Sequence, residues 1–266
     1  RNAAWVNSVG LLVVGVNDDS YSVENNGFLV CLDDTLGTRW SKTFRDDSAK
    51  GAGLTDIAVS PGGVIVLAGY SVYEACTKMQ DGSSSCQYYR RPYGAMVTGD
   101  GTTLWERTYD YRIGYQGTVS AVYSSGVLIV ADSILIRTDP QGEVLWSKFF
   151  PRQMHDIAGT ANGEFVLITS ATGNVAVKLE WISQDGQVVR NLDLPGFSDP
   201  QRVVVLSDNS VLAVARRALA RVSSEGTVEW TIPAQHHTFA GAAELPNGSE
   251  ERRVGKECRS RWSPYH

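Results

Sequence analysis

The sequence predicts an all-β fold made of repeated units, each a sheet of four antiparallel strands. Three observations support this prediction. A tryptophan-containing motif recurs about every forty residues, a turn signal precedes each copy, and apolar strands of regular length separate the copies. A period of about 40–50 residues is typical of propeller blades, in which one repeat forms one sheet. We therefore expect the chain to fold as part of a β-propeller.

The repeat period is defined by four tryptophans and one arginine. Trp105 precedes Trp146 by 41 residues, Arg190 follows Trp146 by 44, and Trp230 follows Arg190 by 40. The first interval, from Trp40 to Trp105, is 65 residues, so the second unit carries an insertion. We expect the four tryptophans to dock each blade on its neighbour, so that Trp146→Ala costs about 3–5 kcal/mol.

Each unit is predicted to end in a β-hairpin whose last strand carries the tryptophan or Arg190. A glycine lies three or four residues earlier, where the chain reverses with positive φ. Seven residues before the tryptophan stands a short polar side chain that can accept hydrogen bonds in a tight turn. The polar residues are Asp33, Thr98, Asp139, Ser183 and Ser223, and the glycines are Gly37, Gly101, Gly142, Gly186 and Gly226.

The first half of each unit is predicted to be two strands joined by a short polar turn. The segments DIAVSPGGVIVLAG, TVSAVYSSGVLIVA, DIAGTANGEFVLIT and RVVVLSDNSVLAVA follow this pattern. Their second strand is almost continuously apolar, which is typical of a strand buried on both faces. WVNSVGLLVVG matches with its first strand shortened, and FAGAAELPNG matches a first strand alone.

These patterns divide residues 3–248 into five blades and a stub. We expect the blades at 3–44, 56–109, 118–150, 155–194 and 200–232, with a stub at 237–248 and the insertion at 71–93. The predicted fold class is an all-β, partial β-propeller of four-stranded antiparallel blades, with five blades plus the first strand of a sixth. Because each blade depends on its neighbours for burial, we expect poor behaviour as a soluble monomer.

The last eighteen residues, 249–266, break the repeat. They hold five Lys/Arg and three Glu without strand-like alternation, and they resemble the translation of a common sequencing adapter. We expect a non-native tail and a native chain truncated at both ends. A natural basic tail that binds an acidic partner is the alternative.

Composition disfavours several classes of protein. With 42% hydrophobic and 20% charged residues, the chain is not expected to be disordered. No apolar run approaches about eighteen residues, the length that a membrane-spanning helix needs. The formal net charge of −5 disfavours a nucleic-acid partner, which normally requires a basic domain.

The hairpin pattern LD-x-x-x-G-x-x-W-S-K-x-F resembles the repeats of quinoprotein-like (pyrroloquinoline-quinone-like) β-propellers. It is also similar to bacterial secreted propeller-repeat proteins with units of the form VVKLD…G…LWSKTF. The resemblance covers residues 3–248 and implies that the outer-strand tryptophan docks on the next blade. Quinoprotein dehydrogenases bind their quinone beside a vicinal cysteine pair and have one more residue between Asp and Trp. This chain lacks that pair, and Arg190 replaces one tryptophan, so we expect no cofactor.

The insertion in the second blade carries two cysteines. Cys76 and Cys86 flank a segment that contains the turn signal Asp81-Gly82. A disulfide between them would lock a surface lobe by about 3 kcal/mol. It would also imply an extracellular, cell-surface or periplasmic location. Two reduced thiols on a cytosolic loop are the alternative, and a zinc site is disfavoured because zinc takes four ligands.

The loops at one end of the propeller form the expected binding face. In a four-stranded blade the insertion and the blade-to-blade linkers emerge at the same end, and binding usually resides on such loops. The run from Tyr88 to Tyr93 supplies aromatic and arginine side chains typical of hot spots; covering a small core within the insertion is the alternative. The face comprises Tyr88, Tyr89, Arg90, Arg91, Tyr93, Tyr111, Arg112, Tyr115, His155, His236 and His237, beside Asp46, Asp47, Lys50, Phe197 and Asp199.

The sequence shows no catalytic constellation, neither a G-x-S-x-G elbow nor a phosphate-binding loop. A metal site from His155, His236 and His237 is disfavoured because their linkers are two blades apart. We expect a non-catalytic secreted or surface propeller that binds a protein or glycan, with missing blades of its own full-length chain as further partners. The alternatives are a spacer domain and a fragment of a propeller enzyme, either a quinoprotein-like oxidoreductase or a glycan-active enzyme.

Overall fold

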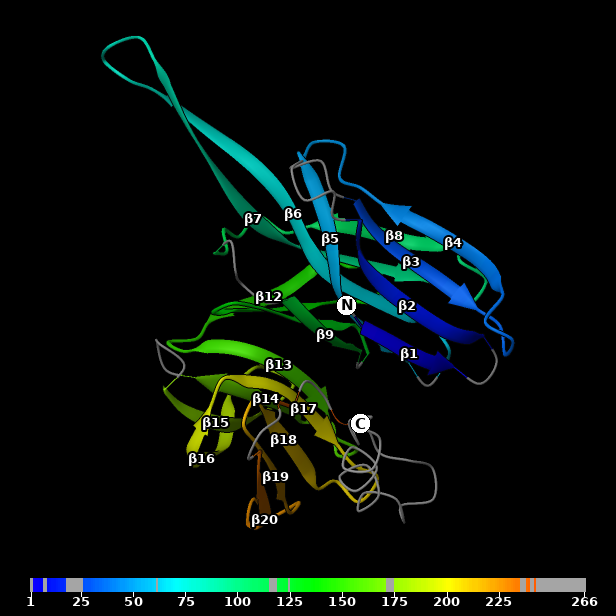
Figure 1. Cartoon of the computed structure of the whole chain (residues 1–266), viewed down its shortest axis with the longest axis vertical. Helices are drawn as coiled ribbons and strands as arrows, with labels where there is room; N and C mark the ends of the chain where they lie inside the picture. The colour runs from blue at the N-terminus through cyan, green and yellow to red at the C-terminus, as the bar shows by residue number, and fades with distance from the viewer. Residues whose placement is uncertain are drawn as a thin grey trace, which may run out of the picture.

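The computed structural model describes residues 2–6, 9–17, 26–60, 62–114, 119–123, 125–170, 175–234, 238–239 and 242. In this part of the chain, twenty β-strands form five sheets, each made of four consecutive antiparallel strands. The sheets are arranged as the blades of a β-propeller (Figure 1), which confirms the predicted fold class for five blades. The described residues include no helix long and apolar enough to cross a membrane. The tail at 249–266, and nearly all of the expected stub at 237–248, lie outside the described residues.

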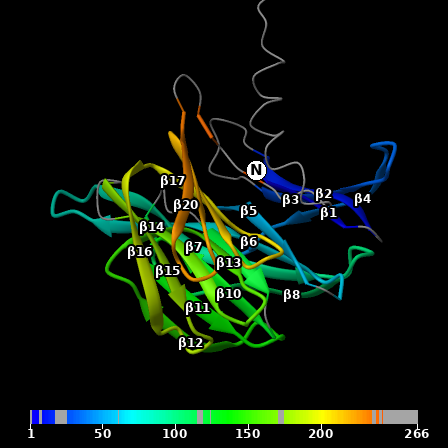
Figure 2. The same ribbon diagram turned by 90° about the horizontal axis from the view of Figure 1, so that it is seen from below.

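The blades follow one another around the molecule in chain order (Figure 2). Blade one contains β1 (Asn2–Val6), β2 (Gly10–Asn17), β3 (Asn26–Leu32) and β4 (Thr38–Phe44). Blade two contains β5 (Gly51–Val59), β6 (Ile65–Lys78), β7 (Ser84–Val97) and β8 (Thr103–Thr108). Blade three contains β9 (Val119–Tyr123), β10 (Val127–Ala131), β11 (Ile134–Thr138) and β12 (Val144–Phe149). Blade four contains β13 (Gln153–Gly159), β14 (Phe165–Ser170), β15 (Val175–Ile182) and β16 (Val188–Ser198), and blade five contains β17 (Pro200–Val205), β18 (Val211–Ala215), β19 (Ala218–Val222) and β20 (Val228–Pro233).

The turn before the last strand of each blade is closed by the predicted polar side chain. The carboxylates of Asp33 and Asp139 accept hydrogen bonds from backbone N–H groups two and four residues later, at 2.8–2.9 Å. The hydroxyls of Thr98, Ser183 and Ser223 accept from the N–H four residues later, at 3.1–3.2 Å. These side chains fix where each hairpin reverses, which sets the register of the outer strand.

The turn glycines adopt the predicted positive φ in blades two to five, with values from 73° to 90°. Blade one differs, because Leu36 takes the positive φ of 66° in place of Gly37. A bulky residue rarely adopts this conformation. The turn of blade one therefore holds an apolar side chain at its tip, and Leu36 is 68% exposed there.

The hydrophobic core lies between the blades, in four clusters that occupy the four junctions between successive sheets. β10, β14 and β18 are buried along their whole length. Their side chains face a neighbour on each side, as the continuous apolar pattern indicates. β3 of blade one instead alternates between buried and half-buried residues.

A second contact joins the outer parts of neighbouring blades. In blades one to four, the side chain at the tryptophan position lies against the turn glycine of the next blade, where a Cβ atom would meet it at 2.5–3.3 Å. The pairs are Trp40 with Gly101, Trp105 with Gly142, Trp146 with Gly186, and Arg190 with Gly226. Glycine at these turns therefore serves two purposes, the positive φ and the space for the neighbouring side chain.

Arg190 makes the same contact as a tryptophan. Its Nη1 donates a hydrogen bond to the carbonyl of Ser224 at 2.8 Å, as Nε1 of Trp105 donates to the carbonyl of Pro140 at 2.9 Å. Both carbonyls lie two residues before the turn glycine. The guanidinium of Arg190 also stacks on Trp181 at 4.0 Å. A planar side chain with an N–H donor is thus what this position requires.

Candidate functional site

The insertion of blade two forms a two-stranded arm. β6 and β7 pair with each other from Ile65↔Val97 to Lys78↔Ser84. β5 accompanies β6 only to Val72, and β8 accompanies β7 only to Tyr93. Beyond those points the ribbon extends away from its blade (Figure 1), and residues 73–89 are called the arm below.

The insertion is not the surface lobe that the sequence suggested, and the alternative in which its aromatic residues cover a small core of its own is wrong. Side chains from Ala75 to Tyr88 are exposed, because the insertion lengthens two existing strands and does not fold back on itself. The arm is therefore a thin ribbon with two open faces and two outer edges. Among the described residues, no third strand pairs with either edge between Tyr73 and Tyr89.

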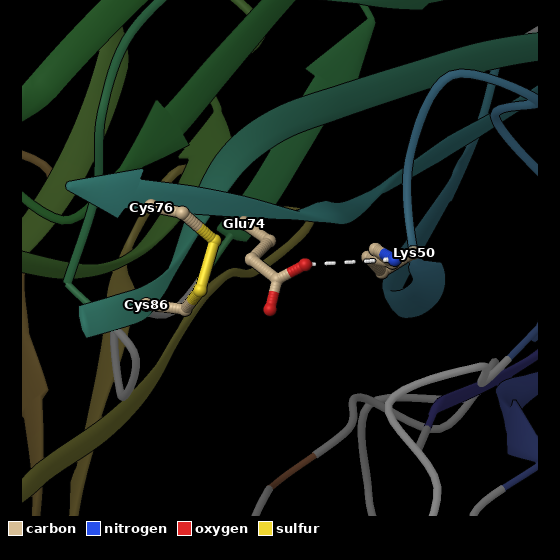
Figure 3. The surroundings of a disulfide bond; sticks show 4 residues. All are labelled: Lys50, Glu74, Cys76 and Cys86. Atoms are coloured by element: carbon tan, nitrogen blue, oxygen red, sulfur yellow. Dashed lines mark ion pairs between the residues drawn. A yellow bond between two sulfur atoms is a disulfide. The ribbon is translucent and has the colours of Figure 1, made fainter. Parts of the chain in front are cut away.

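The predicted disulfide is confirmed and closes the arm near its tip. Cys76 and Cys86 are direct cross-strand partners with their Cα atoms 4.0 Å apart. Glu74 lies on the same face and pairs with Lys50 of the preceding linker at 3.5 Å (Figure 3). Glu74 and the two sulfur atoms lie close together, but a metal needs thiolates and the disulfide removes them.

Asp46, on the linker between blades one and two, fixes the root of the arm. Its Oδ2 accepts hydrogen bonds from the hydroxyls of Tyr73 at 2.5 Å and Thr108 at 2.6 Å, and its Oδ1 accepts from Ser48. Partial burial opposes ionisation, but the hydrogen bonds from Ser48, Thr108 and Tyr73 outweigh it and lower the pKa of the carboxyl to about 2. One ionised side chain thus joins the linker, the arm and β8.

Tyrosine and arginine side chains form a continuous stack on one face of this root. Tyr73 and Tyr89 are cross-strand partners whose ring centroids are 5.8 Å apart. The guanidinium of Arg91 lies 4.5 Å from the Tyr73 ring, and that of Arg112 lies 4.9 Å from the Tyr89 ring. Arg91 also pairs with Asp110 at 3.0 Å. Arg91 of β7 and Arg112 of the following linker cover these rings, so the stack stiffens the root.

Other residues expected on one binding face are separated by the structure. Tyr88 is 42% exposed and lies on the opposite side of the ribbon from Tyr89, because successive strand residues alternate. The guanidinium of Arg90 stacks on Tyr70 at 3.7 Å. Tyr111 donates a hydrogen bond to Ser147 of blade three at 2.8 Å. Among the members of the expected set that the structure describes, Tyr89, Arg91 and Arg112 share the stack at the root.

Tyr93 does not belong to a surface. It is 2% exposed within the cluster between blades one and two, and its hydroxyl donates to Glu106 at 2.8 Å. Tyr93 belongs to the part of β7 that lies within the blade and not to the arm, and this explains its burial. Tyr115, His236 and His237 lie outside the described residues.

His155 is the extra residue of a β-bulge, where the register of β13 shifts between Met154 and Asp156. Its Nε2 lies 2.8 Å from the Ser170 hydroxyl. Burial lowers the pKa of this imidazole, against the opposing effects of Asp132 and Asp199. Burial thus favours the neutral form of the ring, which is half-buried against Ser170 of β14.

Sequence reasoning missed a polar cluster on the innermost strands. Asp56, Asp156 and Arg202 occupy one position of the repeat, each directly after a bulge in β5, β13 or β17. Arg202 pairs with Asp56 at 3.2 Å and so connects blade five to blade two. Asp156 accepts from the backbone N–H of Val203 in the next blade at 3.0 Å. The alignment of the segments DIAV, DIAG and RVVV as first strands of the repeat was the sequence signal that could have revealed this cluster.

A shallow cleft of about 540 Å³ lies where blade two meets blade three. It is lined by residues 106–111 and 142–144. Within it Arg107 pairs with Glu143 at 2.6 Å, and the Tyr109 hydroxyl donates to the carbonyl of Gly142 at 3.2 Å. These contacts join the two blades, which leaves the arm as the stronger candidate for binding.

No family model and no curated protein matches this sequence. Solved structures match it through the fold. A protein of unknown function from Bacteroides caccae has a TM-score of 0.54 and 15% identity, over 91% of this chain and 85% of that one. BamB from Moraxella catarrhalis has a TM-score of 0.54 and 10% identity, over 86% of this chain and 60% of that one.

Hydrazine synthase from Kuenenia stuttgartiensis has a TM-score of 0.55 and 12% identity, over 80% of this chain and 62% of that one. The present chain thus spans about three fifths of the BamB and hydrazine synthase chains. BamB and hydrazine synthase are β-propeller proteins. At these identities the likeness shows the fold alone, and it agrees with the blades described above: this chain is a β-propeller.

Proposed function

We propose that this protein is a binding module that engages a protein partner through the arm, residues 73–89. The observation that carries the proposal is the exposure of a rigid ribbon, closed by the Cys76–Cys86 disulfide and held at its root by Asp46. A ribbon with little internal core is a costly structure to maintain, since exposed two-stranded hairpins are marginally stable. The disulfide and the root contacts offset that cost.

A protein partner fits this surface better than a glycan. The edges of the arm offer backbone N–H and C=O groups to an added strand, which is a common mode of peptide recognition. The stacked rings of Tyr73 and Tyr89, which a sugar would use as a platform, carry the guanidinium groups of Arg91 and Arg112. Tyr88, exposed on the other face, is the aromatic anchor of the proposed interface.

The disulfide also supports a location outside the cytosol, because exposed disulfides persist in oxidising compartments. We place the protein in the periplasm, at the cell surface or in the extracellular space. The tryptophan and glycine contacts support a repeat of the quinoprotein-like type. The proposed binding role needs no cofactor.

The proposal is tested by selecting displayed peptides against the intact, oxidised protein. Selected peptides should lose binding to a variant in which an Asn-Gly turn replaces residues 75–87, joining the cross-strand partners Glu74 and Tyr88. Tyr88→Ala should weaken binding at least about tenfold. The matched control is Phe149→Ala, an exposed aromatic of blade three. Peptides or glycans that bind the shortened variant equally well would contradict the proposal.

A further inference from the structure

The outer edge of β6 is open along the arm. Beside the blade this edge is paired, since the carbonyl of Val72 accepts a hydrogen bond from the backbone N–H of Lys50 at 2.8 Å. Backbone groups that point to one side recur at every second residue of a strand, so those of Glu74, Cys76 and Lys78 point to the same edge. Among the described residues, no strand pairs with β6 there. Three residues thus offer backbone donors and acceptors to a strand laid alongside them.

The side chains of these three residues share one face of the ribbon, with an acid at the root and a cation toward the tip. Between the two charges lies the Cys76–Cys86 disulfide (Figure 3). The N···O distance from Lys50 to Glu74 is 3.5 Å, and the Lys50 side chain is 52% exposed. An exposed ion pair of this kind contributes little, so the carboxylate of Glu74 can accept a second cation.

The order of these charges complements itself. A strand that pairs antiparallel with the β6 edge meets Lys78 first and Glu74 four residues later. Opposite charges are favoured at directly opposed positions, so that strand should carry an acid followed four residues later by a cation. β6 has this order itself. Two copies related by a two-fold axis at Cys76 place Glu74 of each opposite Lys78 of the other.

The other features of the arm agree with this register. On the β7 edge the equivalent places are held by uncharged residues, Ser84, Cys86 and Tyr88, so the charge pattern selects the β6 edge. In the two-fold arrangement the turn at 79–83 reaches the level of Val72 in the other copy, where Asp81 and Lys50 are again opposite in charge. A two-stranded ribbon is marginally stable on its own, and a sheet of more strands is more stable.

We propose that the partner of the arm is a second copy of this chain, whose arm pairs antiparallel with the first along β6. This inference rests on the proposed function, since it names the partner that the arm engages. The two arms form one four-stranded sheet in the order β7–β6–β6–β7. The contact uses the same surface on both copies, so it is isologous and closes at a dimer. Because only a short stretch of each strand pairs, the dimer should be a weak one.

Sedimentation velocity across a concentration series of the intact, oxidised chain tests this proposal. The wild type should form a dimer as the concentration rises. Glu74→Lys and Lys78→Glu should each lower the association constant at least about tenfold. Two-fold symmetry explains the size of the effect, because one substitution turns both opposed pairs into pairs of like charge. Both residues lie on the arm, outside the clusters between the blades, so the fold should be retained.

An equimolar mixture of the Glu74→Lys and Lys78→Glu chains gives the sharpest result. One arm then carries two cations and the other two acids, so the two chains should form a heterodimer at least as stable as the wild-type dimer. The doubly reversed chain, Glu74→Lys with Lys78→Glu, should also dimerise like the wild type. The control is Gln87→Lys, which adds a charge at an exposed residue of β7 on the opposite face and should leave association unchanged.

Three outcomes would each overturn the inference: a wild type that stays monomeric, charge-reversed chains that associate no better together than alone, or a control that dissociates the dimer. In each of these cases, displayed peptides that still require the arm for binding would leave the proposed function standing. The failure of this inference and the failure of the proposed function are therefore distinguishable.

Discussion

Replacing Gly186 by alanine separates two roles that this glycine combines. Gly186 has a φ of 73°, and a Cβ atom built on it would lie 2.5 Å from Cη2 of Trp146. The positive φ alone costs an alanine about 1–2 kcal/mol. Displacing the indole adds part of the about 3–5 kcal/mol expected for Trp146→Ala. We expect Gly186→Ala to lower the free energy of unfolding by about 2–4 kcal/mol.

The matched control is Gly163→Ala in the first turn of the same blade. Gly163 has a similar φ of 86°, but the nearest atom to a Cβ at this position would be Nε2 of Gln184 at 3.5 Å, an ordinary contact. This change should therefore cost only the about 1–2 kcal/mol of backbone strain. The difference between the two variants measures the docking of Trp146 without deleting the indole.

Guanidinium denaturation followed by circular dichroism gives the free energies, compared at unchanged m-value. In a Trp146→Ala background, Gly186→Ala should cost no more than Gly163→Ala, because the indole that it would strike is gone. The reasoning is refuted if the two glycine variants differ by less than about 0.5 kcal/mol in the wild-type background. It is also refuted if the cost of Gly186→Ala is unchanged when Trp146 is absent.

Three further predictions concern single contacts. Asp46→Asn should loosen the arm root and remove an acid-sensitive contribution to the free energy of unfolding. The pKa of the Asp46 carboxyl is lowered from 3.8 to about 2. This contribution is therefore present above pH 3.8 and lost as the pH falls toward 2. An acid denaturation curve identical to wild type in that window would contradict this. Replacing Cys76 and Cys86 by serine should expose residues 79–83 to limited proteolysis, with a local loss of about 3 kcal/mol and unchanged melting of the blades; an uncut arm would count against it. Arg190→Ala should cost about 1–2 kcal/mol in thermal or chemical unfolding, whereas Arg190→Trp should retain most of that stability, and equal losses would show that the position needs no planar donor.

The fold was predictable because the repeat sets it at three levels. The spacing of the tryptophans gives the blade, the polar residue seven places earlier closes the hairpin, and the continuous apolar strand gives the two-sided burial. Each signal depends on local sequence alone. Leu36 departs from this pattern, since an apolar residue takes the positive φ and the glycine does not.

The candidate site was less predictable because it depends on strand length and on contacts between distant residues. Composition marked the insertion as polar and aromatic, but did not distinguish a lobe from two lengthened strands. Tyr93 lies in the same run as Tyr89, and only the point where β8 begins to pair with β7 separates the buried residue from the arm. The pairing of Asp56 with Arg202 joins residues 146 positions apart, which no local pattern reveals.

The arm extends beyond the blade that carries it. From Tyr73 to Lys78 a β-strand rises about 17 Å, so the tip lies well outside the blades (Figure 1). Asp46 and the tyrosine–arginine stack clamp one end, and the disulfide prevents the two strands from parting at the other. The ribbon is therefore fixed to the propeller at its root, and its two strands are held together near its tip. The orientation of the tip is set by the blade that carries it.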